Sequence, residues 1–374
     1  MSATVTPPPP SEDLAPRLRA IDACRGIAVV LMVISHPFRL LAVPRLYDVT
    51  LKTGWGQLML ALKPSASMFF LCFGLMVGMI YTAPHRSFGK KPALRLMRRG
   101  LEVFIAYKLL LILELKARGF SWAKIVPVLL YQKFASWTEI LNFYAIVLTL
   151  SPLLIWTWRR LPVQVQFAIP ALLWGATEVV RATSPWPGAW ATLEVILAGR
   201  QGFYIFPILP WLIPVTVGVL LGERVPALAK RGKGALIGAL LGLAGLSLIV
   251  YFWACDGEIV RSLTLTAQNV LKHPPRLTFL SVTLAAAFVI MAGAFGAYGV
   301  QKEPPSTTNP LEVLGRHSLL IFNVHFAVTF LYIIYKHNLE RVVPTEALAL
   351  SVLLVVFVYL CSLLREKIPD GGGV

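Results

Sequence analysis

The stretch RLRAIDACRGIAVVLMVISHPFRLL, residues 17–41, places a long apolar run between basic ends. An apolar run of about 17 to 25 residues with charges mainly at its borders is typical of a helix that crosses a lipid bilayer. Similar runs recur along the chain, which has 374 residues, of which 57% are hydrophobic and 14% charged. A soluble domain carries about 25% charged residues. The composition therefore predicts an all-α, polytopic transmembrane helix bundle and excludes a soluble fold.

The apolar runs also predict how the chain is organised. Ten of them qualify as spans, at 25–43, 64–83, 100–115, 139–158, 162–180, 203–222, 235–254, 277–299, 317–335 and 346–364. A weaker run at 122–137 contains two lysines and a proline, so we expect a re-entrant or interfacial segment there. We expect a disordered N-terminal tail at 1–16, one membrane-embedded domain at 17–367 and a flexible C-terminal tail at 368–374.

The net charge of +17 comes from basic residues in short loops beside the apolar runs. There they set topology and meet anionic lipid head groups, so the bilayer is the expected partner and nucleic acid is not. The two densest basic clusters, at 85–99 and 223–233, fall on the same side as the N-terminus. The positive-inside rule therefore predicts a multi-pass membrane protein with a cytoplasmic N-terminus. The chain has neither an H-E-x-x-H motif nor metal-binding Cys/His spacing, so we expect no metal site.

The first span carries ionisable residues on one helical face. At about 100° and 1.5 Å per residue, Arg25 and His36 are roughly 20° and about 16 Å apart, and Asp22 lies within about 40° of the same line. An ionisable side chain deep in a span indicates a functional site, although a hydrogen bond to a neighbouring helix would also explain His36. Pro37 disfavours helical geometry at His36, so we expect a break in the helix there. Gly26 is better explained by helix packing than by phosphate binding.

Four segments, in order, then resemble a known family. Arg17, Ile21 and Asp22, followed by Arg25-Gly26-Ile27-Ala28 and His36, look like the opening of membrane acyltransferases. These are the acyltransferase 3 group and the heparan-alpha-glucosaminide N-acetyltransferase group with its bacterial relatives. FPILPWLIPVTVGVLLGE (206–223), KHPPRLTFLSVTLA (272–285) and LGRHSLLIFNVHFAV (314–328) are similar to segments of the second group. His273 and Arg276 stand where that group usually has Tyr and Ser, and Phe322 replaces a Tyr.

The resemblance implies an enzyme of the bacterial inner membrane. It would transfer an acyl group, usually acetyl, from cytoplasmic acyl-CoA to a hydroxyl or amine of a glycan or glycolipid. Acyl transfer needs a base and a clamp for the donor. His36 is the expected base, or the carrier of the acyl group in a two-step transfer, with Asp22 assigned to the same catalytic group. Ser35 faces about 100° away and is a weaker nucleophile candidate.

The donor clamp should be basic, because coenzyme A carries several phosphates and Arg binds them better than Lys. Arg25, Arg95, Arg98 and Arg99 are the candidates, and Arg95-x-x-Arg98 is similar to a motif of acyltransferase 3 proteins. For each of the last three taken singly, a topology anchor is the somewhat better explanation. Phosphates held at the cytoplasmic face would place the thioester near His36. Asn323 and His325 are expected to orient the substrate or His36.

Two other classes of protein remain open from the residues alone. A secondary transporter or lipid flippase uses membrane histidines and arginines as a substrate pathway or proton relay. A non-catalytic membrane scaffold would suit a chain whose family motifs have changed at His273 and Arg276. Thioester turnover is the property that separates the enzyme from both.

Overall fold

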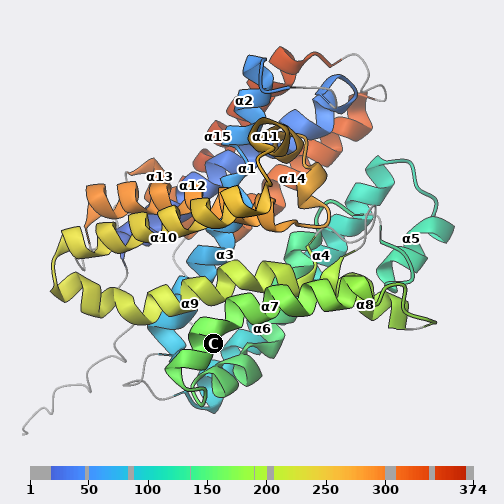
Figure 1. The fold of residues 1–374 in the computed structure, drawn as a ribbon. Coiled ribbons are helices and arrows are strands. Elements are labelled where there is room, and N and C mark those ends of the chain that lie inside the picture. The colour runs from blue at the N-terminus through green and yellow to red at the C-terminus, as the bar shows by residue number, and fades with distance from the viewer. Residues whose placement is uncertain are drawn as a thin grey trace, which may run out of the picture.

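The computed structural model describes residues 18–46, 50–82, 88–134, 136–188, 190–199, 206–299, 309–336 and 342–367. The tails expected at 1–16 and 368–374 lie outside the described residues. Helices make up the fold (Figure 1), in this order: α1 (Arg19–Leu46), α2 (Gly54–Ala61), α3 (Pro64–Val77), the π-helix η1 (Gly78–Thr82), α4 (Lys90–Ala117), α5 (Trp122–Leu129), α6 (Glu139–Trp158), α7 (Val163–Ala182), α8 (Trp190–Ala198), α9 (Ile208–Lys230), α10 (Lys233–Ala254), α11 (Ile259–Ala267), the 3₁₀ helix η2 (Val270–Lys272), α12 (Leu277–Tyr298), α13 (Pro310–Arg316), α14 (Ser318–Lys336) and α15 (Pro344–Lys367).

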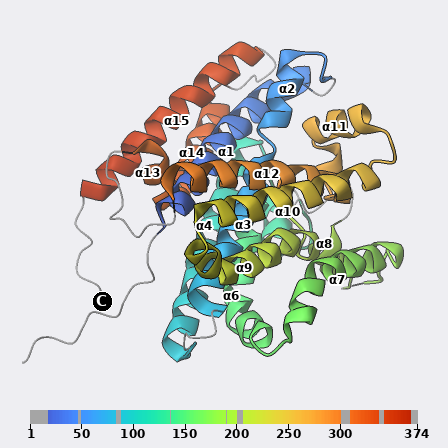
Figure 2. The same ribbon diagram turned by 60° about the vertical axis from the view of Figure 1, so that its left-hand side comes forward.

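The predicted all-α, polytopic bundle is confirmed. Within the described ranges no strand occurs, and nine helical segments are long and apolar enough to cross a membrane. Several of these segments expose large apolar side chains, as α10 does with Ile249 and Trp253. In lipid an exposed apolar face costs nothing, so these faces suit the membrane rather than a missing partner. In Figures 1 and 2, α10 runs beside α12 at the edge of the bundle, and α15 forms another edge beside α1.

Helix α4 accounts for the tenth predicted span. Its 28 residues are long enough to cross, but charged side chains keep it out of the nine strongly apolar segments. Those charges have partners: the Lys108 ammonium donates to the Leu129 carbonyl at 2.8 Å, and the buried Glu114 carboxylate accepts from the backbone N–H of Trp137 at 2.9 Å. Paired charges are tolerated inside a membrane protein. The weak run at 122–137 contains only the eight-residue α5, which is too short to span.

The break expected at His36 is wrong. Helix α1 continues through Pro37 to Leu46. Proline removes one backbone N–H, yet helices in membrane proteins keep their course through proline because neighbouring groups satisfy the freed carbonyl. His36 is therefore presented by a continuous helix, and the helical arithmetic that separates it from Arg25 applies.

Close glycine crossings hold the central helices together. A Cβ on Gly26 of α1 would lie 1.9 Å from the Leu311 carbonyl oxygen of α13, and one on Gly315 would lie 1.8 Å from the Asp22 oxygen. The packing role expected of Gly26 is thus confirmed. A Cβ on Gly74 of α3 would meet the Val215 oxygen of α9 at 2.0 Å. Glycines four residues apart make this crossing reciprocal: Gly74 on α3 and Gly78 at the start of η1 face Gly218 and Gly222 on α9.

We predict that Gly222→Ala destabilises the protein. The added Cβ would sit 2.3 Å from the Leu75 carbonyl oxygen, so α3 and α9 must separate. Overpacking of this kind costs about 1–3 kcal/mol. The matched control is Gly242→Ala on α10, where the Cβ meets open space and alanine favours the helix by about 0.5–1 kcal/mol. In detergent, the midpoint of thermal unfolding should be lower for Gly222→Ala than for the native protein, and it should not be lower for Gly242→Ala. Equal midpoints for the two variants would contradict the crossing.

Candidate active site

Two histidines from α1 and α14 meet at the centre of the site. The Nδ1 atom of His36 lies 3.0 Å from the Nε2 atom of His325, and the two rings stack with centroids 5.3 Å apart. Phe326 packs against His36 with a centroid distance of 4.6 Å. His325 has no solvent-exposed surface. The histidine predicted to orient His36 from α14 is therefore in direct contact with it.

The hydrogen bonds of the pair determine which nitrogen carries each proton. The Nδ1 atom of His325 lies 2.9 Å from the Ile321 carbonyl oxygen, which can only accept. Nδ1 of His325 must therefore be the donor, and in the neutral ring its Nε2 is an acceptor. His36 then donates from Nδ1 to that Nε2. The Nε2 atom of His36 keeps its lone pair, as a general base or nucleophile requires.

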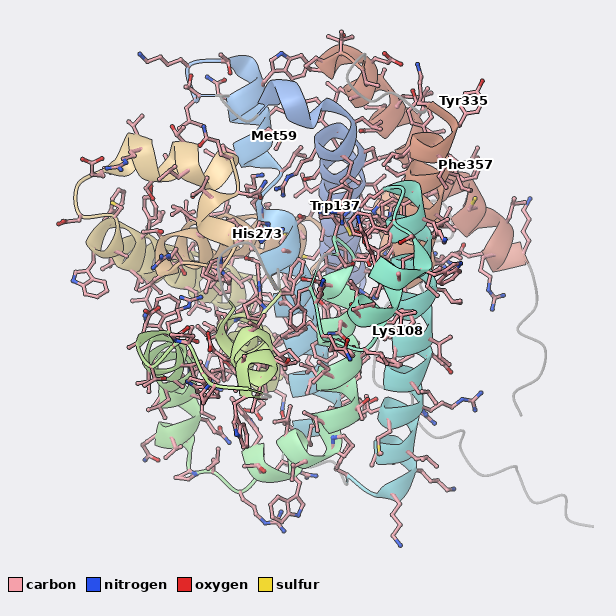
Figure 3. The ribbon with its side chains drawn as sticks, turned by 90° about the vertical axis from the view of Figure 1, so that its right-hand side faces the viewer. Met59, Lys108, Trp137, His273, Tyr335 and Phe357 are labelled. Carbon is pink, nitrogen blue, oxygen red and sulfur yellow. The ribbon has the colours of Figure 1, made fainter. Side chains whose placement is uncertain are left out.

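His36 lines a cavity of about 110 Å³, called here the His36 cavity. Ser35 and Phe326 also line it, together with residues of the loop around η2 and the N-terminal end of α3. Ser35 thus shares the cavity with His36, although the helical arithmetic placed it about 100° away. Figure 3 labels two further lining residues, Trp137 and His273, which lie at a similar height in the central part of the bundle.

The charged residues that line the His36 cavity are all cationic. Arg39, Lys63 and Lys272 contribute to it, and no Asp or Glu is among its described lining residues. Lys63 is only 6% exposed. The Lys272 ammonium lies 5.0 Å from the centre of the Phe206 ring. Burial first, and then the neighbouring Arg39 guanidinium, lower the pKa of Lys272 to about 7.

A second and larger cavity, about 330 Å³, lies toward the N-terminal end of α1 and is called here the Arg25 cavity. Arg25 and Arg99 are its basic lining residues, and most of the others are apolar or aromatic, including Phe73, Met76 and Tyr144. Arg25 donates to the Ser318 hydroxyl at 2.6 Å. A basic group at one end of an apolar cavity can hold an anionic head with a chain beyond it.

The two cavities share a wall. Phe69 of α3 and Ile140 of α6 line both of them, so these side chains separate the His36 cavity from the Arg25 cavity. The separation runs along α1, from Arg25 to His36, over about 16 Å. Any chain that reached from one residue to the other would pass Phe69 and Ile140.

The other predicted site residues lie outside both cavities. Asp22 is buried at the crossing of α1 and α13, about 21 Å along α1 from His36, too far for direct proton exchange. Arg95 and Arg98 are exposed on α4, and Arg98 pairs with Glu102 at 3.4 Å. Asn323 is half-buried on α14, and its Oδ1 makes no hydrogen bond within the described part of the chain. The roles assigned to these four residues stay predictions.

Sequence reasoning missed the cations of the His36 cavity, although some signals were present. Arg39 follows His36 by three residues, which places it on the same side of α1 one turn later. Lys272 belongs to the segment KHPPR, in which the family resemblance points to His273 and Arg276 and not to the lysine. Lys63 precedes Pro64 at the start of α3, and nothing in the pattern distinguishes it from an ordinary interfacial lysine.

We predict that neutral His36 carries its proton on Nδ1. Nitrogen-15 NMR of histidine-labelled protein should show Nδ1 of His36 protonated and Nε2 unprotonated. His325→Phe removes the acceptor for Nδ1, so the tautomer preference of His36 should weaken in that variant. His317→Phe, at the junction between α13 and α14, is the control and should leave the His36 signals unchanged. A His36 protonated on Nε2 in the native protein would contradict the hydrogen-bond assignment.

Comparison with known proteins gives one finding. The model of a protein family, described as heparan-alpha-glucosaminide N-acetyltransferase, catalytic, matches residues 17–254. The match runs from the start of α1 to the end of α10 and so includes Arg25, His36 and Arg99. His325 and the segments at 272–285 and 314–328 lie beyond it. None of the curated proteins compared with the chain matches it.

Proposed function

Because the chain belongs to the heparan-alpha-glucosaminide N-acetyltransferase catalytic family, we propose that it acetylates a glycan or glycolipid. In this proposal acetyl-CoA binds at the N-terminal end of α1, on the cytoplasmic side of the bacterial inner membrane. The acceptor hydroxyl or amine binds in the His36 cavity. The observation that carries the proposal is the hydrogen-bonded pair His36–His325, whose protonation pattern leaves a lone pair on His36 Nε2.

The Arg25 cavity suits the donor. Coenzyme A has a phosphate-bearing head and a long pantetheine arm that ends in the thioester. Arg25 and Arg99 would hold phosphates, and the apolar lining would receive the arm. The thioester would then reach His36 past Phe69 and Ile140. Transfer in this geometry needs no movement of the coenzyme A head group across the membrane, because only the thioester end of the arm enters the His36 cavity.

His36 serves the chemistry by one of two routes. In the direct route Nε2 takes the proton from the acceptor as the acceptor attacks the thioester carbonyl; the carbon–sulfur bond breaks and the coenzyme A sulfur leaves as a thiolate, which is then protonated. In the two-step route Nε2 attacks the carbonyl itself and the thiolate leaves. The acceptor then attacks acetyl-His36, the bond between Nε2 and the acetyl carbon breaks, and the freed Nε2 takes the acceptor's proton. In both, the Nδ1–H bond to His325 supports the positive charge that develops on the ring.

We predict that His36→Ala abolishes acetyl transfer while Ser35→Ala retains it. Ser35 lines the same cavity, so its variant controls for altered packing there. General acid–base catalysis contributes about 10²–10⁴-fold, and turnover should fall by at least that factor in His36→Ala. The assay measures release of coenzyme A thiol from acetyl-CoA with a panel of amino sugars and glycans. Loss in Ser35→Ala alone would assign the nucleophile to the serine.

The two routes differ when the acceptor is withheld. Acetyl-CoA alone should release about one thiol per protein if His36 carries the acetyl group, and none above the His36→Ala background if the transfer is direct. Mass spectrometry of the rapidly quenched protein would locate the acetyl group. Folded protein that neither binds nor consumes acetyl-CoA, but shows counterflow of a solute in vesicles, would contradict the enzyme and support a transporter.

We predict that Arg25→Ala and Arg99→Ala raise the KM for acetyl-CoA about tenfold or more, because each removes a charge-assisted hydrogen bond to phosphate. Arg98→Ala is the comparison on the same turn of α4, since Arg98 is exposed and lies outside the Arg25 cavity. Steady-state kinetics at saturating acceptor would measure the KM values. An equal rise in all three variants would assign the effect to general surface charge rather than to the cavity.

A further inference from the structure

The His36 cavity holds more positive charge than acetyl transfer itself requires. Arg39, Lys63 and Lys272 line it, and the described part of the chain places no carboxylate in that lining. No ion pair to Lys63 or Lys272 occurs among the described residues. After burial, the neighbouring Arg39 guanidinium is the second cause that lowers the pKa of Lys272, so positive charges in this lining repel one another. A buried ammonium group without an ion pair is costly, so Lys63 and Lys272 favour an anion that enters from outside.

The position of the cluster indicates which reactant brings the anion. The donor phosphates have basic partners of their own in the Arg25 cavity, on the other side of Phe69 and Ile140. The cluster instead lines the same cavity as the histidine at which the acceptor would react. The two buried ammonium groups of Lys63 and Lys272 match a dianionic phosphate better than a single carboxylate, and the Arg39 guanidinium lines the same cavity.

Resting on the acetyl transfer proposed above, we propose that the acceptor carries a phosphate group near the reacting amine or hydroxyl, and that Lys63, Lys272 and Arg39 bind it in the His36 cavity. The acceptor is then a phosphosugar, either soluble or as the head group of a lipid. Lys63 and Lys272 bind and position the acceptor, while His36 performs the proton or acyl transfer. The phosphate is not broken or formed in the reaction.

The first experiment measures binding without turnover. Glucosamine 6-phosphate should raise the melting temperature of the native protein and of His36→Ala, whereas glucosamine should not. Lys63→Gln and Lys272→Gln should each weaken this binding about tenfold or more. The matched control is Lys52→Gln, because Lys52 is exposed just before α2 and lies outside the cavity. Equal binding of the two sugars, or an equal loss in Lys52→Gln, would overturn the proposal even if acetyl transfer is confirmed.

The second experiment separates acceptor binding from stabilisation of the reacting carbonyl. With acetyl-CoA saturating, the lysine variants should raise the KM for glucosamine 6-phosphate far more than they change the kinetics with glucosamine, which has no phosphate. A fall in kcat for both acceptors would instead place the lysines at the thioester oxygen and overturn the proposal.

A third experiment tests whether the acceptor is a lipid, with phosphatidylcholine vesicles that carry glucosaminyl phosphatidylinositol. A lower KM for this lipid than for the soluble phosphosugar assigns the acceptor to the membrane, and a higher one assigns it to solution.

The charge of Lys272 should make the KM for glucosamine 6-phosphate depend on pH. Lys272 faces Arg39, Lys63, His36 and His273 around the cavity, and its pKa of about 7 leaves it charged below that pH and neutral above it. The KM for glucosamine 6-phosphate should therefore rise as the pH increases above 7. Lys272→Arg keeps its charge throughout and should remove that rise while preserving binding. The same rise in Lys272→Arg would show that Lys272 is not the group responsible.

Discussion

Close contact between helix backbones is the constraint on which this structure depends. Helices in lipid gain little by burying apolar surface, since the lipid chains are equally apolar, so they associate by packing and hydrogen bonds. Here glycines allow carbonyl oxygens of α13 and α9 to approach α1 and α3 where a methyl group would collide. These contacts tolerate almost no displacement. They therefore fix the relative positions of the helices more strictly than a layer of leucines would.

The site follows from those crossings. The crossing at Gly26 and Gly315 joins α1 to α13, and α14 starts only two residues after α13 ends. Ser318 is consequently held against Arg25, and about two turns later His325 is held against His36. The crossing of α3 with α9 in turn holds Phe69 at the wall between the cavities. The glycine crossings thus position both the Arg25 cavity and the His36 cavity, which are the two ends of the proposed acetyl path.

The sequence predicted the membrane fold because long apolar runs have few alternatives, and it predicted the face of α1 because helical spacing is regular. Helix α4 shows where hydropathy alone is insufficient: its charges are stabilised by Trp137, Ser136 and Leu129, which become neighbours only in three dimensions. The break expected at Pro37 failed for a similar reason, since packing overrides the local preference. The pairing of His36 with His325 and the cluster of Lys63 with Lys272 join distant parts of the chain, which periodicity cannot relate.

Phe69 and Ile140 also affect how permeable the protein makes the membrane to ions. A cavity toward each end of a spanning helix would form a water-filled pore if the two were joined. Ions would then leak through it, and the cell would lose the electrochemical gradient that drives its energy metabolism. Because two apolar side chains line both cavities at their boundary, the protein keeps an electrically insulating layer there. A smaller residue at position 69 would thin this layer.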